Sequence, residues 1–204
     1  MEDFFADRLF RALELGDVHP GTLLLAAPGM DLDFRTRSVV MVVEQTAEHT
    51  LGVALNMRGD IAVANVMEHL VPLVAKPQAF YVGGEENRDS IVALGVLKAG
   101  LTPAALAEVP FVRYLDHRIV VIDLRTPIEQ LQDIVESVRL FAGFIEWQGN
   151  DLAEELGQGY WYATPALASD IIAPGAVDLW AEVLRRQPMP LPLFATFPAD
   201  LEDN

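Results

Sequence analysis

The stretch RSVVMVVEQTAEHTLGVALN, residues 37–56, decides the fold. Residues 38–44 form an apolar run rich in β-branched valine, and this composition predicts a β-strand. A short polar link, residues 45–50, leads to a second apolar run that ends at Asn56. Two strands joined by so short a link are expected to pair as antiparallel neighbours.

Apolar runs on both sides of this hairpin predict further strands. They cover residues 23–27, 79–82, 90–98, 118–124 and 160–164. Helical spacing or helix-end signals are found in residues 63–74, 101–109, 126–143, 150–159 and 175–187. Strands come in pairs before helices appear, without a regular strand–helix alternation. This order favours an α+β domain with a mixed or antiparallel sheet over a doubly wound parallel fold.

Residues 126–143 carry the strongest helix signal of the chain. Thr126 is placed to cap the helix, Pro127 follows at its first position, and Glu129 completes a capping box. An apolar face is expected from Ile128, Leu131, Val135 and Val138. The last part, residues 138–144, has the alternative of continuing as a strand.

The whole chain, residues 1–204, is expected to form a single domain, because its length suits one core. Residues 1–18 are predicted to form an amphipathic helix, with Phe5, Leu9 and Leu13 at four-residue steps. That helix can pack on the body or on another subunit. Residues 188–204 are predicted to be an extended, proline-rich segment, docked through Leu193, Phe194 and Phe197, with an acidic tip.

Charge and composition limit the classes of function. The formal net charge is −16, which disfavours direct binding to nucleic acids and to anionic membranes, since both need basic side chains. The chain has no cysteine, which excludes disulfides and thiolate catalysis. No basic start with an apolar run and no stretch of ~18 apolar residues is present. We therefore expect a cytoplasmic protein that does not bind membranes.

A search for chemical motifs predicts no metal site, no cofactor and no catalytic residue. The chain lacks phosphate-loop, dinucleotide-binding and nucleophile-elbow patterns. Its four histidines lie far apart, without zinc spacing. Acidic pairs such as Glu85 and Glu86 are more typical of solvated loops than of acid–base catalysis.

Two features remain as candidates for binding. Arg35 and Arg37 lie two residues apart, and on an extended chain they could hold a carboxylate or phosphate. The alternative is pairing with the protein's own carboxylates, which this acidic chain favours. Asn56 ends one strand, and Gly83 and Gly84 end another. These residues either tie down loops and allow close backbone approach or, if the strand ends meet, form a binding surface.

The runs GTLLLAAP, RSVVMVVE, TLGVALN, YVGG, FAGFIEW and YWYATPA occur in an order that resembles the YqgE/AlgH family of bacterial proteins. The resemblance extends from Gly21 to the segment DLWAEVLRRQP. It implies a single α+β domain with coiled, bifurcated mixed, largely antiparallel β-sheets flanked by helices. No enzymatic activity is established for the family, and one branch has been described as a transcriptional regulator of exopolysaccharide production.

The family's signature falls on ten positions of this sequence. Six form a candidate binding surface by this resemblance: Arg37, Ser38, Glu44, Asn56, Gly83 and Gly84. Four are interpreted as structural: Gly52, Gly143, Trp147 and Glu155. The chain departs from the family at a histidine after the double-glycine strand, which is absent, and at Asn150, where a glycine is usual.

Three functions follow as hypotheses. The first is a non-enzymatic regulatory or protein-interaction module, whose acidic surface suits a basic partner. The second is a small-molecule sensor or an unrecognised enzyme, with a cleft near Arg37, Asn56, Gly83 and Gly84. The third is direct transcriptional regulation, which the net charge disfavours. An unknown protein partner and a homo-oligomer both remain open.

Overall fold

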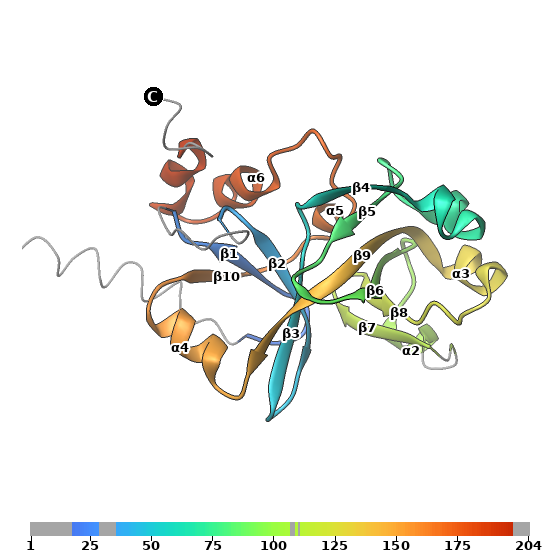
Figure 1. Ribbon diagram of the computed structural model, residues 1–204, viewed down its shortest axis with the longest axis horizontal. Coiled ribbons are helices and arrows are strands. Elements are labelled where there is room, and N and C mark those ends of the chain that lie inside the picture. Colours follow the sequence, from blue (N-terminus) through green and yellow to red (C-terminus); the bar gives the residue numbers. More distant parts are fainter. Residues whose placement is uncertain (1–17, 29–35, 107–108, 110, 198–204) are drawn as a thin grey trace, which may run out of the picture.

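A long strand, β9 (Val135–Gln148), crosses the middle of the computed structural model and joins its two halves (Figure 1). The structure describes residues 18–28, 36–106, 109 and 111–197. Side chains of β9 are buried at consecutive positions in its first half and at alternating positions in its second half. Other strands pair with both of its edges. It is therefore the element on which the rest of the sheet is built.

The main sheet runs in the order β10-β1-β2-β3-β9-β6-β8-β7. Neighbours along this path are antiparallel. The strands are β1 (Thr22–Ala26), β2 (Val39–Gln45), β3 (His49–Ala54), β6 (Glu86–Leu97), β7 (Val112–Asp116), β8 (Ile119–Ile122) and β10 (Trp161–Pro165). The predicted antiparallel pairing of β2 with β3 is confirmed, with Val40 opposite Ala54.

The sheet forks at one edge of β9. The end of β9 pairs with β3, from His49 opposite Gln148 to Gly52 opposite Ile145. A few residues earlier the same strand pairs in parallel with β5 (Ala79–Val82), with Tyr81 opposite Phe141. Strand β5 in turn pairs with β4 (Arg58–Ala62). The expected α+β domain with bifurcated, mixed and largely antiparallel sheets is therefore confirmed.

Short helices cover the sheet. They are α2 (Pro103–Leu106), α3 (Ile128–Ile134), α4 (Asp151–Gly157), α5 (Ala168–Ile171) and α6 (Leu179–Arg185), with 3₁₀ helices η2 (Val63–Asn65), η3 (Glu68–Leu73) and η4 (Leu191–Thr196). Helix α6 and η4 lie together over β1 and β2 (Figure 1). Trp180 of α6 is fully buried in the largest core cluster, and its indole donates to the carbonyl of Ala26 at 2.9 Å. None of the helices in the described part of the chain is long and apolar enough to cross a membrane.

The prediction of one helix over residues 126–143 is wrong beyond Ile134, and the alternative of a strand over residues 138–144 is confirmed. Helix α3 ends there, and β9 begins at Val135, because pairing with β6 between Val135 and Phe144 outweighs the helical spacing of the apolar residues. The predicted capping box is also absent. Pro127 is the N-cap and has no side-chain hydrogen bond, while the Thr126 hydroxyl donates to the carbonyl of Asp123 at 2.7 Å.

Other differences are local. Strands β4 and β7 were not predicted, and residues 63–74 form two 3₁₀ helices, with Pro72 inside η3. In the C-terminal segment, η4 replaces the expected extended chain. Leu193 is 63% exposed and does not dock, whereas Phe194 and Phe197 pack against the largest core cluster as predicted. The predicted helix of residues 1–18 lies, up to residue 17, outside the described residues, as does the acidic tip from residue 198.

Candidate functional site

Arg37 and Asn56 meet where β2 begins and β3 has just ended. The Asn56 side chain accepts from the amide of Val39 and donates to the carbonyl of Arg37, each at 3.0 Å. The backbone of Arg37 has φ +53°, a left-handed conformation that bulky residues rarely adopt. These two hydrogen bonds therefore fix the turn into β2, which is the loop-tying role that the sequence allowed for Asn56.

The guanidinium of Arg37 is occupied inside the protein. It donates to the carboxylate of Asp178 and to the carbonyl of Phe197, and it lies 4.2 Å from the centre of the Trp180 ring. Its side chain is 14% exposed. We call these groups the Arg37 clamp, since they hold α6 and the end of η4 on the start of β2. Arg35, the second arginine of the sequence hypothesis, lies outside the described residues.

Ser38 lies next to the clamp and is almost fully buried. Its hydroxyl is one of two buried side-chain groups of the described residues that have no hydrogen-bond partner; the other belongs to Tyr81. A buried hydroxyl without a hydrogen-bond partner lowers the stability of the folded state, so a structural or functional reason is expected for each of the two.

Gly83 and Gly84 lie at the fork, and they meet the end of β3 there. The amide of Ala54 donates to the carbonyl of Gly83 at 2.8 Å, and the amide of Gly83 donates to Ala142 of β9 at 2.8 Å. A β-carbon at Gly84 would lie 2.1 Å from the carbonyl of Phe144. The two strand ends of the sequence hypothesis therefore do come together, and what joins them is backbone packed against backbone.

Gly143 provides the other side of this crossing. Its φ is +71°, and a β-carbon there would lie 2.7 Å from the carbonyl oxygen of Gly84. Gly52 is equally tight, since a β-carbon would lie 2.6 Å from the side chain of Val40. Because glycine has no β-carbon, it allows such close contacts without displacing the neighbouring strand.

The remaining signature residues also bind neighbours. The Glu155 carboxylate accepts from the indoles of Trp147 at 2.8 Å and Trp161 at 2.6 Å, and the two rings are nearly perpendicular. Glu44 is half exposed, 3.2 Å from the ring of His49 and 3.8 Å from Arg113. Helix α4 is thereby attached to β9 and β10, while Glu44 belongs to a surface cluster.

Strand β9 carries a buried cation, Arg139, that was not among the residues predicted from the sequence. Arg139 is 1% exposed, and backbone carbonyls are its hydrogen-bond acceptors. The contacts are Nε to Ile171 at 3.3 Å, Nη1 to Pro77 at 3.3 Å, and Nη2 to Lys76 at 3.4 Å and to Ala173 at 3.0 Å. No carboxylate of the described residues forms an ion pair with it. Burial lowers the pKa of the Arg139 guanidinium from its usual value, because the charged form loses its hydration.

Tyr81 forms the aromatic side of this group. The centre of its ring lies 4.4 Å from Arg139 Cζ, a distance at which the ring face attracts the cation. The residue is 3% exposed, and its hydroxyl is the second buried group without a partner. A β-carbon on Gly175 would lie 3.5 Å from that hydroxyl, so the loop before α6 covers the ring. We call Arg139, Tyr81 and the carbonyls around them the Arg139 cluster.

A pocket of about 380 Å³ adjoins the cluster between α5 and α6. It is lined by Ser169, Asp170, Ala173, Pro174, Val177, Leu179, Glu182, Arg185 and Arg186. The buried carboxylate of Asp170 is held by both terminal nitrogens of Arg186, at 2.7 and 2.5 Å. Ala173 belongs to both places, because it lines the pocket while its carbonyl accepts from Arg139.

One signal in the sequence could have identified the cluster. Arg139 is the only charged residue in the run VRLFAGFI, residues 138–145. A lone charge within an apolar strand destabilises the fold unless other groups compensate it, so such a residue is a candidate for a specific role. The helical reading of residues 126–143 hid this signal, since a helix would have offered Arg139 a solvent-facing side.

Two other hollows are open to solvent. One, of about 500 Å³, is lined by Ile91, Phe111, Val112, Arg113, Val121, Ile122, Asp123 and Leu124. The other, of about 190 Å³, is lined by His19, Thr22, Asp116, His117, Ala163, Thr164 and Pro165. No group of three or more potential metal ligands gathers anywhere in the described ranges.

Comparisons with known proteins agree with this architecture. The profile of the AlgH-like family matches residues 23–192. A UPF0301 protein of Corynebacterium efficiens is 47% identical over 204 residues, which cover 100% of both chains. A crystal structure of a Corynebacterium diphtheriae protein is similar with a TM-score of 0.89 and 45% identity, covering 95% of this chain and all of that one. The solution structure of the AlgH protein from Pseudomonas aeruginosa shares the fold, with a TM-score of 0.60 and 19% identity over 89% of this chain and 97% of that one.

Proposed function

The chain belongs to the AlgH-like family, and we propose that it acts as a non-enzymatic regulatory or protein-interaction module whose partner is a basic protein. The proposal rests on the ion pairs between arginines and carboxylates. Most arginines of the described part are held by the protein's own carboxylates. The pairs are Arg37–Asp178, Arg88–Glu85, Arg113–Glu44, Arg118–Glu136, Arg125–Asp123, Arg185–Glu182 and Arg186–Asp170.

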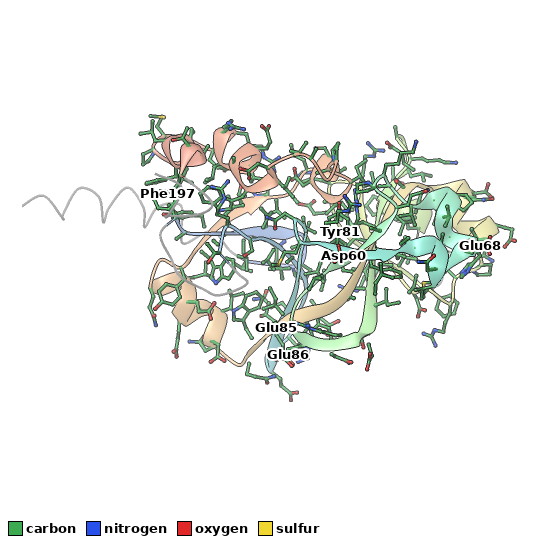
Figure 2. All side chains as sticks on the ribbon, turned by 45° about the horizontal axis from the view of Figure 1, so that its top comes forward. Asp60, Glu68, Tyr81, Glu85, Glu86 and Phe197 are labelled. Carbon is green, nitrogen blue, oxygen red and sulfur yellow. The ribbon has the colours of Figure 1, made fainter. Side chains whose placement is uncertain are left out.

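What the surface then offers to a partner is its surplus of carboxylates. Asp60 and Glu68 are exposed on β4 and η3, and Glu86 is exposed where β6 begins (Figure 2). A net charge of −16 accelerates encounter with a positively charged protein, and this attraction weakens as salt screens it.

The segment from β4 to η3 combines this charge with apolar groups. Ile61 is 56% exposed next to Asp60 in the sequence, and Val66 is 58% exposed two residues before Glu68. Strand β4 pairs with β5 on one side. Exposed apolar residues among charges are typical of protein interfaces, so we assign this segment, with Asp60, Ile61, Val66 and Glu68, as the partner surface.

The same charge distribution argues against direct DNA binding. Duplex binding requires several arginines or lysines free to neutralise phosphates. In the described part most arginines are ion-paired, Arg139 is buried, and Lys98 donates to the carbonyl of Gln132. The hypothesis of a small-molecule sensor has its support at the Arg139 cluster, since the polar groups of Arg37 and Asn56 are engaged within the fold.

Native mass spectrometry on the chain purified gently from its own cells tests the proposal. We expect a protein complex at low salt that dissociates as the ionic strength rises past about 0.15 M. The double variant Asp60→Asn, Glu68→Gln should lose the partner at lower salt than the wild type. A matched control, Glu48→Gln in the link before β3 with Glu146→Gln on β9, removes the same charge elsewhere and should behave as the wild type.

Three outcomes would overturn the proposal. The chain would be recovered alone at low salt, or both double variants would release the partner equally. Alternatively, duplex DNA would bind at physiological salt in a gel-shift measurement, which would favour direct regulation instead.

A further inference from the structure

Arg139 differs from the other arginines of the described part in what balances its charge. Seven of them lie within ion-pair distance of a carboxylate. Arg139 is 1% exposed and has backbone carbonyls and the face of Tyr81 instead. An arginine does not lose its proton in proteins, so a full positive charge stays buried without a counter-charge.

The hydrogen bonds around this charge are also loose. Three of the four donor–acceptor distances are 3.3 Å or longer, at Ile171, Pro77 and Lys76. Charged N–H groups that bind anionic oxygens typically reach ~2.7–2.9 Å. By contrast, Arg186 holds Asp170 at 2.7 and 2.5 Å in the neighbouring pocket wall. The acceptors of Arg139 are therefore neutral carbonyls, and no carboxylate of the described residues contacts this buried cation.

The hydroxyl of Tyr81 is a second, independent observation that points to a ligand. It is buried beside the cation and has no hydrogen-bond partner. A hydroxyl both donates and accepts, and buried hydroxyls in folded proteins are almost always bonded to protein, water or ligand. An oxyanion would give the cation a counter-charge and the hydroxyl a hydrogen-bond acceptor at the same time.

A loop gives access to this place. Residues 172–178 connect α5 to α6, and residues 174–177 are exposed on their outer side. The inner side touches the cluster, where Ala173 accepts from Arg139 and Gly175 lies against Pro77 and the Tyr81 hydroxyl. Ala173 and Pro174 also line the 380 Å³ pocket, so the same segment borders both the pocket and the cluster.

We propose that the Arg139 cluster is a binding site for a small molecule with an oxyanion group, a carboxylate or a phosphate. The oxyanion takes the place of the Ala173 carbonyl on Arg139 and accepts a hydrogen bond from Tyr81. The remainder of the molecule occupies the pocket between α5 and α6. This proposal does not depend on the protein-interaction function, because the partner surface on β4 and η3 involves other residues.

A purely structural role for Arg139 makes a different prediction. In that role the guanidinium only ties the carbonyls of Lys76 and Pro77 to the end of α5. Anions would then have no specific effect, and the Tyr81 hydroxyl would contribute nothing but an unsatisfied group.

Thermal unfolding in sodium phosphate and in sodium succinate, each matched to sodium chloride of equal ionic strength at pH 7, separates the two roles. We expect a saturable rise in Tm with at least one oxyanion and not with chloride, because a ligand that binds the folded state stabilises it. A response to phosphate alone, to succinate alone, or to both identifies the group that the site takes.

Variants assign the response to the cluster. Tyr81→Phe removes only the hydroxyl and should raise the apparent Kd by about tenfold, the effect of one hydrogen bond. Arg139→Lys, which keeps the charge but not the planar fork, should raise it at least as much. Ser38→Ala removes the other unpartnered hydroxyl, beside the Arg37 clamp, and should leave the apparent Kd unchanged.

Amide NMR spectra locate the oxyanion directly. Saturable shifts are expected at Ala173, Gly175 and Tyr81 of the wild-type chain. The proposal is overturned if neither oxyanion raises Tm above chloride. It is equally overturned if the rise is unchanged in Tyr81→Phe and Arg139→Lys, or if the shifted amides lie at the exposed Arg185 rather than in the loop.

Discussion

The Arg37 clamp and the Arg139 cluster are built from the same parts with one exception. In each, a guanidinium lies over an aromatic ring, at 4.2 Å from Trp180 and 4.4 Å from Tyr81. Each arginine donates to backbone carbonyls, and each region holds one of the two unpartnered buried hydroxyls, at Ser38 and Tyr81. The exception is the carboxylate of Asp178, which pairs with Arg37 and has no counterpart at Arg139.

This difference separates a structural contact, the Arg37 clamp, from a candidate binding site, the Arg139 cluster. At the clamp, Asp178 neutralises the charge within the protein, and the result is the attachment of α6 to the sheet. At the cluster, carbonyl dipoles and a ring face compensate the charge only in part. The proposed oxyanion would supply at Arg139 the negative charge that Asp178 supplies at Arg37.

The largest effect that would test the contrast is expected from Arg139→Met. The variant leaves the carbonyls of Ile171 and Ala173 without a donor in the interior, which costs more than the removal of a buried charge returns. We expect the free energy of unfolding to fall by about 2–4 kcal/mol in urea denaturation. A variant as stable as the wild type would show that these carbonyls do not need the guanidinium.

A smaller effect is expected from Arg37→Met. The clamp is partly exposed, so we expect a loss of about 1–2 kcal/mol. Asp178→Asn is the partner variant, because the amide keeps an oxygen for the N-cap bond from Ala181 while it removes the charge.

The double variant then isolates the ion pair from the other contacts of Arg37. A coupling of about 0.5–1 kcal/mol between the two changes is expected for a pair at this exposure. Zero coupling in the cycle would mean that Trp180 and Phe197 hold the arginine, and the distinction between clamp and cluster would lose its basis.

The sequence predicted the elements of the clamp better than those of the cluster, for a physical reason. The strands of residues 37–56 are local, and their composition and short link determine them. The excess of acidic residues predicted that Arg37 pairs with a carboxylate of the same chain. The sequence did not indicate which one, because Asp178 lies 141 positions away. Such partners follow from the tertiary fold and leave no local pattern.

The cluster was hidden by a conflict between local and tertiary preference. The apolar spacing of Leu131, Val135 and Val138 fits a helix, but β6 pairs with β9 between Val135 and Phe144 and makes this segment a strand. Similarly, the glycines at 83 and 84 indicated close approach, while the partner that approaches, β9 at Gly143 and Phe144, could not be read from the sequence.

The smallest effect concerns an exposed arginine, Arg125, and gives the comparison a third member. Asp123 accepts from the side chain and the backbone amide of Arg125, and these bonds lower the pKa of Asp123 from 3.8 to about 2. A carboxyl whose pKa is lower in the folded state stabilises it fully above 3.8. That contribution is lost as the pH falls from 3.8 to about 2.

Urea denaturation at pH 5 and at pH 2.5 should therefore show a stability difference between the wild type and Asp123→Asn that shrinks at the lower pH. The destabilisation by Arg139→Met should stay the same over this interval, because carbonyl oxygens do not titrate there. If it shrinks as well, a titrating carboxylate supports Arg139 after all, and the contrast between an arginine balanced from within and one left for an outside anion would have to be abandoned.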